Sequence, residues 1–348
     1  MSQEADDDET TGSTGADDFA PLPIDLLPWH AAACDKLTAA AASQRLSHGL
    51  LLQGPAGVGK ERFASALAAA LFCTGRGERL VACGECAECL LSKAATHPDM
   101  HWLRIPEDKK SIGVDQVREV CEQLSMTSMR RGYRVAVIVP AEKMTPSAQN
   151  ALLKTLEEPA PRTVLVLVTA RPSALLATLR SRCQRIEIAR PENTLALHWL
   201  NETLGSAPPP RLLAVAGGSP LKALALAPQF AGLEEQMTGL LEAFLDGRIE
   251  VTRAAADMQG AGLPTRLDWL EAWLVAAVQA ATGVANENPL TFRTGSHLQR
   301  AAVELNITKA FQVLDRLREA RRLLEGSASA SLVVETLLLE LRAAASAR

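Results

Sequence analysis

Four cysteines in one short stretch of the chain have the spacing of a metal site. Cys73, Cys83, Cys86 and Cys89 fall within 17 residues. Four thiolates complete the tetrahedral shell of a structural Zn²⁺ ion, and such a shell leaves no open position for a reacting water. The alternative is four unligated thiols, which the tight clustering disfavours. The sequence therefore predicts one structural zinc ion in a module over residues 73–92.

A glycine-rich segment that follows an apolar run and opens a predicted helix indicates a phosphate-binding loop. Residues 54–60 read GPAGVGK. In this context the glycines let backbone N–H groups face a phosphate, and the lysine reaches the β- and γ-phosphates of a nucleotide such as ATP. The alternative is a tight turn that no longer binds a ligand, so nucleotide binding stays open. The candidate contacts are Gly54, Gly57, Gly59 and Lys60.

The groups that hydrolyse ATP in P-loop enzymes are replaced in this sequence. Glu61 stands where a Ser or Thr normally supplies a hydroxyl to Mg²⁺, and its longer charged side chain does not fit beside a polyphosphate. The strand predicted over residues 134–139 should end in Asp-Glu, but the chain has Val139 and Pro140. Glu142 lies two residues further on and cannot be assumed to substitute. We therefore expect no ATP hydrolysis by this chain.

Two later segments carry the strongest family signal. Residues 147–158 read SAQNALLKTLEE and residues 178–183 read TLRSRC, on either side of an apolar run over residues 164–168. Together with the phosphate loop and the cysteine cluster upstream, this set closely resembles the small-subunit family of sliding-clamp loaders, which are AAA+ proteins. The resemblance covers about residues 21–348. It is strong up to about residue 190 and weak beyond it.

The resemblance implies roles for two residues. Arg182 corresponds to an arginine finger, whose guanidinium stabilises charge on the phosphoryl group of ATP bound to a neighbouring subunit. Thr169 matches a sensor position at the end of the strand over residues 164–168. Taken alone, Arg182 would be read as a surface salt-bridge residue. Arg180 and Arg185 are the nearest competitors for the finger role.

The elements that must position these residues alternate between strand and helix patterns up to about residue 190. This alternation predicts a parallel sheet of about five strands with helical cover, and only helical patterns follow. The expected fold class is α/β plus all-α. The expected parts are a disordered acidic tail (1–20), an AAA+ P-loop core (21–190) that contains the zinc module, a helical lid (191–228) and a C-terminal helical collar for oligomerisation (229–348).

Charge is distributed unevenly along the chain. Residues 1–18 carry seven acidic side chains and no Lys or Arg, and because the whole chain has a net charge of −4, the remainder carries +3. The first segment is thus expected to be disordered. The remainder is too near neutral for broad, charge-driven binding of DNA. Local phosphate contacts are expected instead, and the candidates are Arg130, Arg131, Arg134 and Lys154.

Targeting signals and partners follow from the same reading. The sequence has no apolar run of about 18 residues and no basic-then-apolar N-terminal signal, so we expect a cytoplasmic protein without a membrane partner. The resemblance implies a hetero-oligomeric partnership with clamp-loader motor subunits of the gamma/tau type and with the clamp-opening delta subunit. It also implies transient contact with the sliding clamp, and with primed template DNA as part of the complex.

Three functions remain to be separated. The leading hypothesis is a non-hydrolysing subunit of the DNA polymerase III clamp loader that supplies Arg182 in trans. The first alternative is an ATP-hydrolysing motor subunit of the same complex, which the replacements at Glu61, Val139 and Pro140 disfavour. The second is a zinc-bearing DNA-binding protein unrelated to replication, which the near-neutral charge after the tail disfavours.

Overall fold

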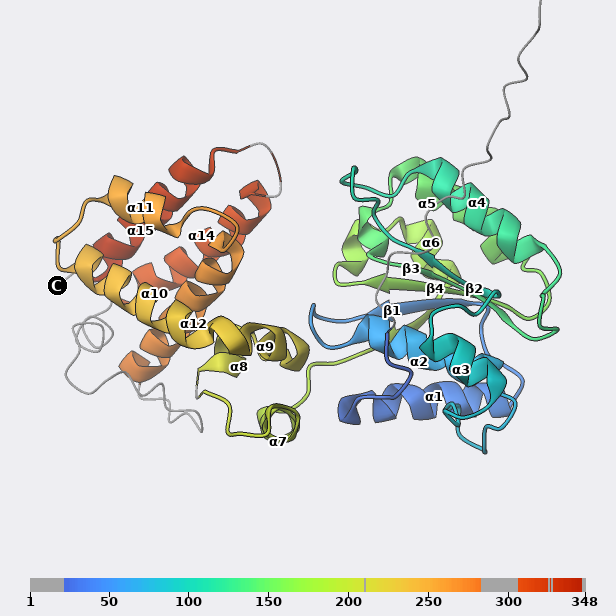
Figure 1. The fold of residues 1–348 in the computed structure, drawn as a ribbon. Helices are drawn as coiled ribbons and strands as arrows, with labels where there is room; N and C mark the ends of the chain where they lie inside the picture. The colour runs from blue at the N-terminus through green and yellow to red at the C-terminus, as the bar shows by residue number, and fades with distance from the viewer. Residues whose placement is uncertain (1–21, 210, 283–305, 325, 327, 346–348) are drawn as a thin grey trace, which may run out of the picture. The chain divides into compact units, whose positions relative to one another are not determined.

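The computed structural model describes residues 22–209, 211–282, 306–324, 326 and 328–345. The chain divides into two compact units, Met1–Ala189 and Arg190–Arg348 (Figure 1). The acidic tail expected over residues 1–20 lies outside the described residues.

The first unit is built around a five-stranded sheet in which every pair of neighbouring strands is parallel, in the order β2-β3-β4-β1-β5. This sheet, with helices on both faces, confirms the predicted α/β core. The strands predicted over residues 134–139 and 164–168 each lie within one residue of their observed bounds. The strands are β1 (Gly49–Gln53), β2 (Met100–Leu103), β3 (Arg134–Ile138), β4 (Thr163–Thr169) and β5 (Gln184–Glu187).

Helices cover both faces of the sheet, which explains why its central strands are continuously apolar. In β3, Val135 and Val137 pack with one apolar cluster, whereas Ala136 and Ile138 pack with the other. Figure 1 shows α1 and α2 on one face, with α3 packed on α2, and α4, α5 and α6 on the other. The helices are α1 (Ala31–Ala42), α2 (Lys60–Phe72), α3 (Ala87–Lys93), α4 (Val114–Ser125), α5 (Pro146–Glu157) and α6 (Ala177–Arg182).

The strand order brings the candidate nucleotide-site segments to one edge of the sheet. Strand β4 lies between β3 and β1, and Thr169 at its end pairs with Gln53 at the end of β1. The carboxyl ends of parallel strands share an edge, so the glycine-rich loop, Thr169 and the residues after β3 are neighbours there.

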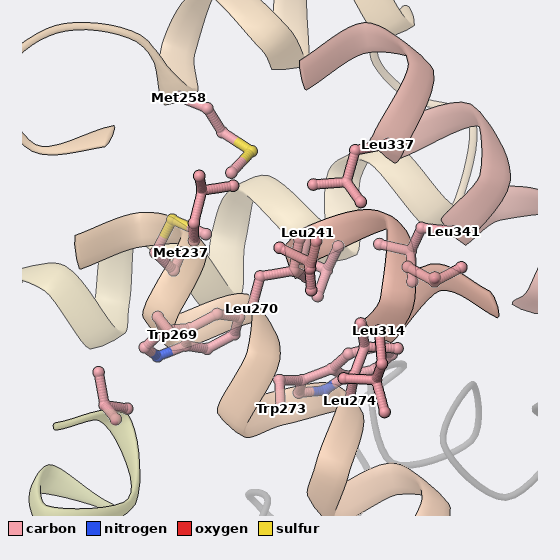
Figure 2. Packing of buried hydrophobic residues seen from close by; sticks show 14 of the residues in the cluster. Met237, Leu241, Met258, Trp269, Leu270, Trp273, Leu274, Leu314, Leu337 and Leu341 are labelled. Carbon is pink, nitrogen blue, oxygen red and sulfur yellow. The ribbon is translucent and has the colours of Figure 1, made fainter. Parts of the chain in front are cut away.

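The described part of the second unit is entirely helical. Figure 2 shows its core, in which the fully buried Trp269 and Trp273 lie among leucine and methionine side chains. Apolar residues of the predicted lid and collar belong to this one cluster, and their division at residue 228 stays a prediction. The helices are α7 (Asn193–Leu204), α8 (Leu212–Val215), α9 (Pro220–Leu226), α10 (Phe230–Leu245), α11 (Val251–Met258), α12 (Leu263–Thr282), α14 (Ile307–Leu324) and α15 (Ala330–Ala345). Among the helices described in either unit, none has the length and apolar character to cross a membrane.

Candidate functional site

The glycine-rich loop connects β1 to α2, as predicted. Gly54, Gly57 and Gly59 have φ values of 151°, 76° and 82°, a range that side chains disfavour. A Cβ atom on Gly54 would lie 2.1 Å from the carbonyl oxygen of Ile188, and one on Gly59 would lie 2.6 Å from Cδ1 of Leu27. Glycine is therefore required at both positions by the close approach of neighbouring segments as well as by backbone conformation.

Lys60 is buried against its own loop. Only 8% of the residue is exposed, and its Nζ donates hydrogen bonds to the carbonyl oxygens of Gly54 at 2.9 Å and Pro55 at 2.5 Å. Burial lowers the pKa of Lys60, and the nearby carboxylates of Glu142 and Glu61 oppose this shift. The loop itself thus satisfies the ammonium group, and a phosphate would have to compete with two carbonyl oxygens for it.

The acidic residues near the loop have other partners. Glu61 pairs with Arg104, whose Nη2 lies 2.9 Å from the Glu61 carboxylate. Glu142 follows β3, and its Oε1 accepts a hydrogen bond at 3.2 Å from the backbone N–H of Ala170, just beyond β4. Val139, directly after β3, is 5% exposed and packs in the apolar cluster beneath α1 and α2. This end of β3 is thus apolar where a hydrolytic P-loop site needs carboxylates.

Trp29 and His30 hold the loop from the other side, a role that no motif in the sequence indicated. Trp29 Nε1 donates to the carbonyl oxygen of Val58 at 2.9 Å. His30 Nδ1 accepts from the backbone N–H of Leu27 at 3.2 Å, so Nε2 carries the proton and donates to the same Val58 oxygen at 3.1 Å. Burial lowers the pKa of His30 to about 4. The imidazole is therefore neutral at physiological pH.

The four clustered cysteines converge in the folded chain. The sulfur atoms of Cys73, Cys83, Cys86 and Cys89 all lie within 4.8 Å of one another. The Cys83–Cys89 and Cys73–Cys86 sulfur pairs are each 3.9 Å apart. A tetrahedral ion with metal–sulfur bonds of about 2.3 Å requires sulfur–sulfur distances of about 3.8 Å. The arrangement therefore fits a metal ion held by four thiolates.

Backbone groups around the cluster stabilise thiolates. The N–H groups of Cys83 and Cys86 donate to the sulfurs of Cys73 and Cys83, at 3.3 and 3.4 Å. For Cys86, burial opposes ionisation, but hydrogen bonds from the backbone of Cys89 and Thr74 outweigh it and lower the pKa to about 5. Burial raises the pKa of Cys89 to about 12. A bound cation would supply the charge that deprotonates such a buried thiol.

A buried imidazole connects the cysteine module to the core. Glu88 lies on α3 between two of the cysteines, and its Oε2 accepts from His97 Nε2 at 3.1 Å. His97 Nδ1 accepts from the backbone N–H of Asp99 at 3.2 Å, which fixes the proton on Nε2. Arg130 Nη2 lies 2.7 Å from Glu88 Oε1. No spacing pattern links these residues, so the sequence did not predict that they contact one another, and it indicated Arg130 only as a candidate DNA contact.

Arg182 is the last residue of α6 and is paired within the chain. Its Nε donates to Glu157 Oε1 at 2.8 Å, its Nη2 lies 2.6 Å from the same oxygen, and its Nη1 donates to the carbonyl oxygen of Thr178 at 2.9 Å. The Arg182 side chain is nevertheless 37% exposed. Thr169 is buried, and its hydroxyl accepts from the backbone N–H of Arg171 at 3.0 Å.

Arg182 and the glycine-rich loop lie at opposite ends of β1. A Cβ atom on Gly49, the first residue of β1, would lie 3.4 Å from the carbonyl oxygen of Arg182. The loop begins after Gln53, the last residue of this strand. Five strand residues span about 16 Å. The structure thus brings Thr169 close to the loop but separates Arg182 from it.

Other predicted arginines differ in exposure. Arg134 is 6% exposed and its Nη2 donates to the carbonyl oxygen of Pro161 at 3.0 Å. Its expected contact with DNA is therefore wrong, because Arg134 is the first residue of β3, an inner strand of the sheet, and its side chain is buried. Arg131 and Lys154 are exposed. Arg180, the first competitor for the finger role, is half-buried, and its Nε has no hydrogen-bond partner among the described residues.

Comparison with known proteins identifies the family. A family model described as "DNA polymerase III, delta subunit" matches residues 29–192. The DNA polymerase III subunit delta' of Pseudomonas aeruginosa is 38% identical over 261 residues, which cover 73% of this chain and 78% of that protein. The subunit delta' of Escherichia coli is 36% identical over 263 residues, with 74% and 78% covered.

A solved structure of a DNA polymerase III gamma subunit-related protein from Thermotoga maritima is 19% identical, covers 90% of this chain and 99% of that one, and has a TM-score of 0.45. That likeness is too distant to add to the assignment. The identity to the curated relatives, which extends over three-quarters of their length, is sufficient by itself. The chain belongs to the DNA polymerase III subunit delta' family.

Proposed function

We propose that this chain is a non-hydrolysing subunit of the DNA polymerase III clamp loader, and that it supplies Arg182 in trans to ATP bound by a neighbouring motor subunit. Membership of the delta' family supports the assignment to DNA polymerase III. The set of motifs from the glycine-rich loop to Ser181-Arg182-Cys183 supports a role in loading the sliding clamp onto primed DNA.

The observation that carries the proposal is the separation of Arg182 from the chain's own phosphate loop. The two lie at opposite ends of β1, about 16 Å of strand apart. An arginine finger has to contact the γ-phosphate of the ATP that it serves. Arg182 cannot do this for its own loop, whereas its partly exposed side chain is accessible to a neighbour.

Three features support the absence of hydrolysis. Lys60 is bonded to its own loop, Glu61 is paired with Arg104, and β3 leads into Val139 and Pro140 rather than into carboxylates. Together they remove the Mg²⁺ ligand and the group that orients the attacking water. These same features disfavour the alternative of an ATP-hydrolysing motor subunit.

The cysteine module is proposed to hold a structural Zn²⁺ ion. Four thiolates at tetrahedral spacing favour zinc over harder ions such as Mg²⁺ or Ca²⁺. With four protein ligands the ion has no vacant position, so it stabilises the fold and takes no part in catalysis. Binding of the ion by all four side chains would couple metal binding to folding of the module.

The proposed partners are motor subunits, the clamp-opening delta subunit, the sliding clamp and primed template DNA, in the cytoplasm. Near-neutral charge outside the acidic tail favours DNA contact shared among several subunits. Exposed Arg130, Arg131 and Lys154 are the remaining local candidates on this chain. The helical unit is proposed to divide into a lid (191–228) and an oligomerising collar (229–348).

The test is a reconstituted clamp loader that carries Arg182→Ala, with Arg118→Ala as the control for loss of an exposed arginine from an ion pair. Turnover at the ATP site that Arg182 completes should fall by about 10³-fold or more, because charge on the γ-phosphoryl group loses its partner. Assembly should be unchanged in size exclusion. Lysine at this position should restore little, because a point charge lacks the planar fork of a guanidinium. Unchanged ATPase and clamp loading in a fully assembled Arg182→Ala complex would rule the role out.

A further inference from the structure

We propose that Glu157 is a positioning residue for Arg182, and that it holds the guanidinium ready for the phosphate of a neighbouring subunit. This inference rests on the proposed finger role of Arg182. Both residues lie in the segments that carry the family resemblance, 147–158 and 178–183. The contact between them emerges only from the folded chain, since the two residues are 25 positions apart.

The contacts leave one edge of the guanidinium uncovered by the carboxylate. Glu157 Oε1 lies at the edge formed by Nε and Nη2, at 2.8 and 2.6 Å. Nη1 donates one hydrogen to the carbonyl oxygen of Thr178 at 2.9 Å. A guanidinium has five N–H groups. One N–H on Nη1 and one on Nη2 therefore remain for the oxygens of a phosphate.

Both residues are carried by well-anchored helices. Leu156, beside Glu157, is 3% exposed, and Leu179 in α6 is fully buried in the same apolar cluster. Because its helix end is packed against the core, the Glu157 carboxylate is held in place and fixes the position of the arginine that pairs with it. Without such a partner, an exposed arginine samples many rotamers. The conformational entropy lost when it is fixed in one of them opposes its binding to the phosphate. Glu157 orders the side chain before the neighbour's ATP arrives.

The ion pair between Arg182 and Glu157 contributes little to folding stability, so a variant can test the positioning role without unfolding the protein. The side chains of Arg182 and Glu157 are 37% and 51% exposed. Ion pairs this exposed contribute little to folding stability, because water and salt screen them. Loss of the carboxylate should therefore leave folding and assembly intact and alter only the orientation of Arg182.

The experiment compares Glu157→Ala, Glu157→Gln and the control Glu158→Ala in the reconstituted clamp loader. Glu158 is the next residue and is also exposed, but Arg182 is paired with Glu157 and not with it. Glu157→Ala should lower kcat for DNA-dependent ATP hydrolysis about tenfold with little change in KM, as expected when a reacting group loses its orientation. Glu157→Gln keeps an acceptor oxygen and should restore part of the rate. Glu158→Ala should match wild type.

A double variant shows whether Glu157 acts through Arg182. In an Arg182→Ala background, Glu157→Ala should cause no further loss. An equal loss in both backgrounds would overturn the positioning role. A wild-type rate for Glu157→Ala together with a slow Arg182→Ala would also overturn the positioning role, but the proposed finger role of Arg182 would stand. If Arg182→Ala itself turned over normally, the proposed function would fail first.

Discussion

His97 stacks on Phe72, with ring centroids 3.7 Å apart and planes 10° from parallel. Phe72 ends α2 and immediately precedes the metal-ligand candidate Cys73. At its edge, the imidazole Nε2 donates to Glu88, which lies on α3 between two further cysteines. A single buried ring therefore contacts both the end of α2 and the cysteine module, at residues that are 16 positions apart in sequence.

Replacement of His97 by alanine is predicted to loosen the cysteine module. The substitution removes a buried ring and leaves Glu88 without one of its donors, so unfolding should become easier by about 2–4 kcal/mol. Urea unfolding of zinc-loaded protein measures this, and the rate of zinc loss to a chelator should rise in parallel. His198→Ala, which removes an exposed imidazole, is the matched control. Equal stability of the two variants would contradict the prediction.

Metal content is predicted to depend on the four clustered cysteines. Anaerobically purified protein should contain one zinc ion per chain by elemental analysis. Cys86→Ser should lower this content, because a hydroxyl is a poor zinc ligand at neutral pH. Cys121→Ser provides the control, because Cys121 lies in α4, outside the cluster. Zinc-free wild-type protein, or equal zinc content in both variants, would remove the basis for the proposed site.

The isolated chain is predicted to show no ATPase activity above background, even with primed DNA and clamp present. The physical reason is the joint replacement of the Mg²⁺ hydroxyl by Glu61 and of the two strand-end carboxylates by Val139 and Pro140. Steady-state phosphate release from highly purified protein is the measurement, with Lys60→Ala as the comparison. Turnover that Lys60→Ala abolished would instead support the motor-subunit alternative.

The sequence predicted the elements and the local motifs well, for reasons specific to this chain. The strands β1, β3 and β4 are short apolar runs buried on both faces, and few other structures suit such runs. The cysteine cluster and the glycine-rich loop are local in sequence, so their residue spacing alone indicates their chemistry.

The contacts of the site could not be predicted in the same way. His97 with Glu88, Arg182 with Glu157, and His30 with the loop carbonyl are pairs that only the packing of separate elements brings together. For Arg134 the sequence indicated a role that the fold does not support. An arginine at the first position of an apolar strand is expected to lie on the surface. In the fold it is buried beside the loop that precedes β4.

Acid is predicted to destabilise the core through His30. The folded-state pKa is lowered from 6.5 to about 4 by burial, so between these values the unfolded chain binds a proton that the folded chain does not. The contribution of the neutral imidazole is thus fully present above pH 6.5 and is lost as the pH falls toward 4. The shift corresponds to about 3 kcal/mol at most.

His30→Gln should reduce this acid sensitivity, because glutamine can donate to the Val58 carbonyl oxygen without titrating. At pH 7.5 the variant should be less stable than wild type, since it loses the bond from Leu27 and the edge contact with Phe63. The gap should narrow as the pH falls to 4.5. Urea midpoints at four pH values between these limits measure the effect. His97 and His101 also have pKa values lowered by burial, but they are common to both proteins and cancel in the difference. A gap that stayed constant with pH would show that His30 does not carry the acid sensitivity.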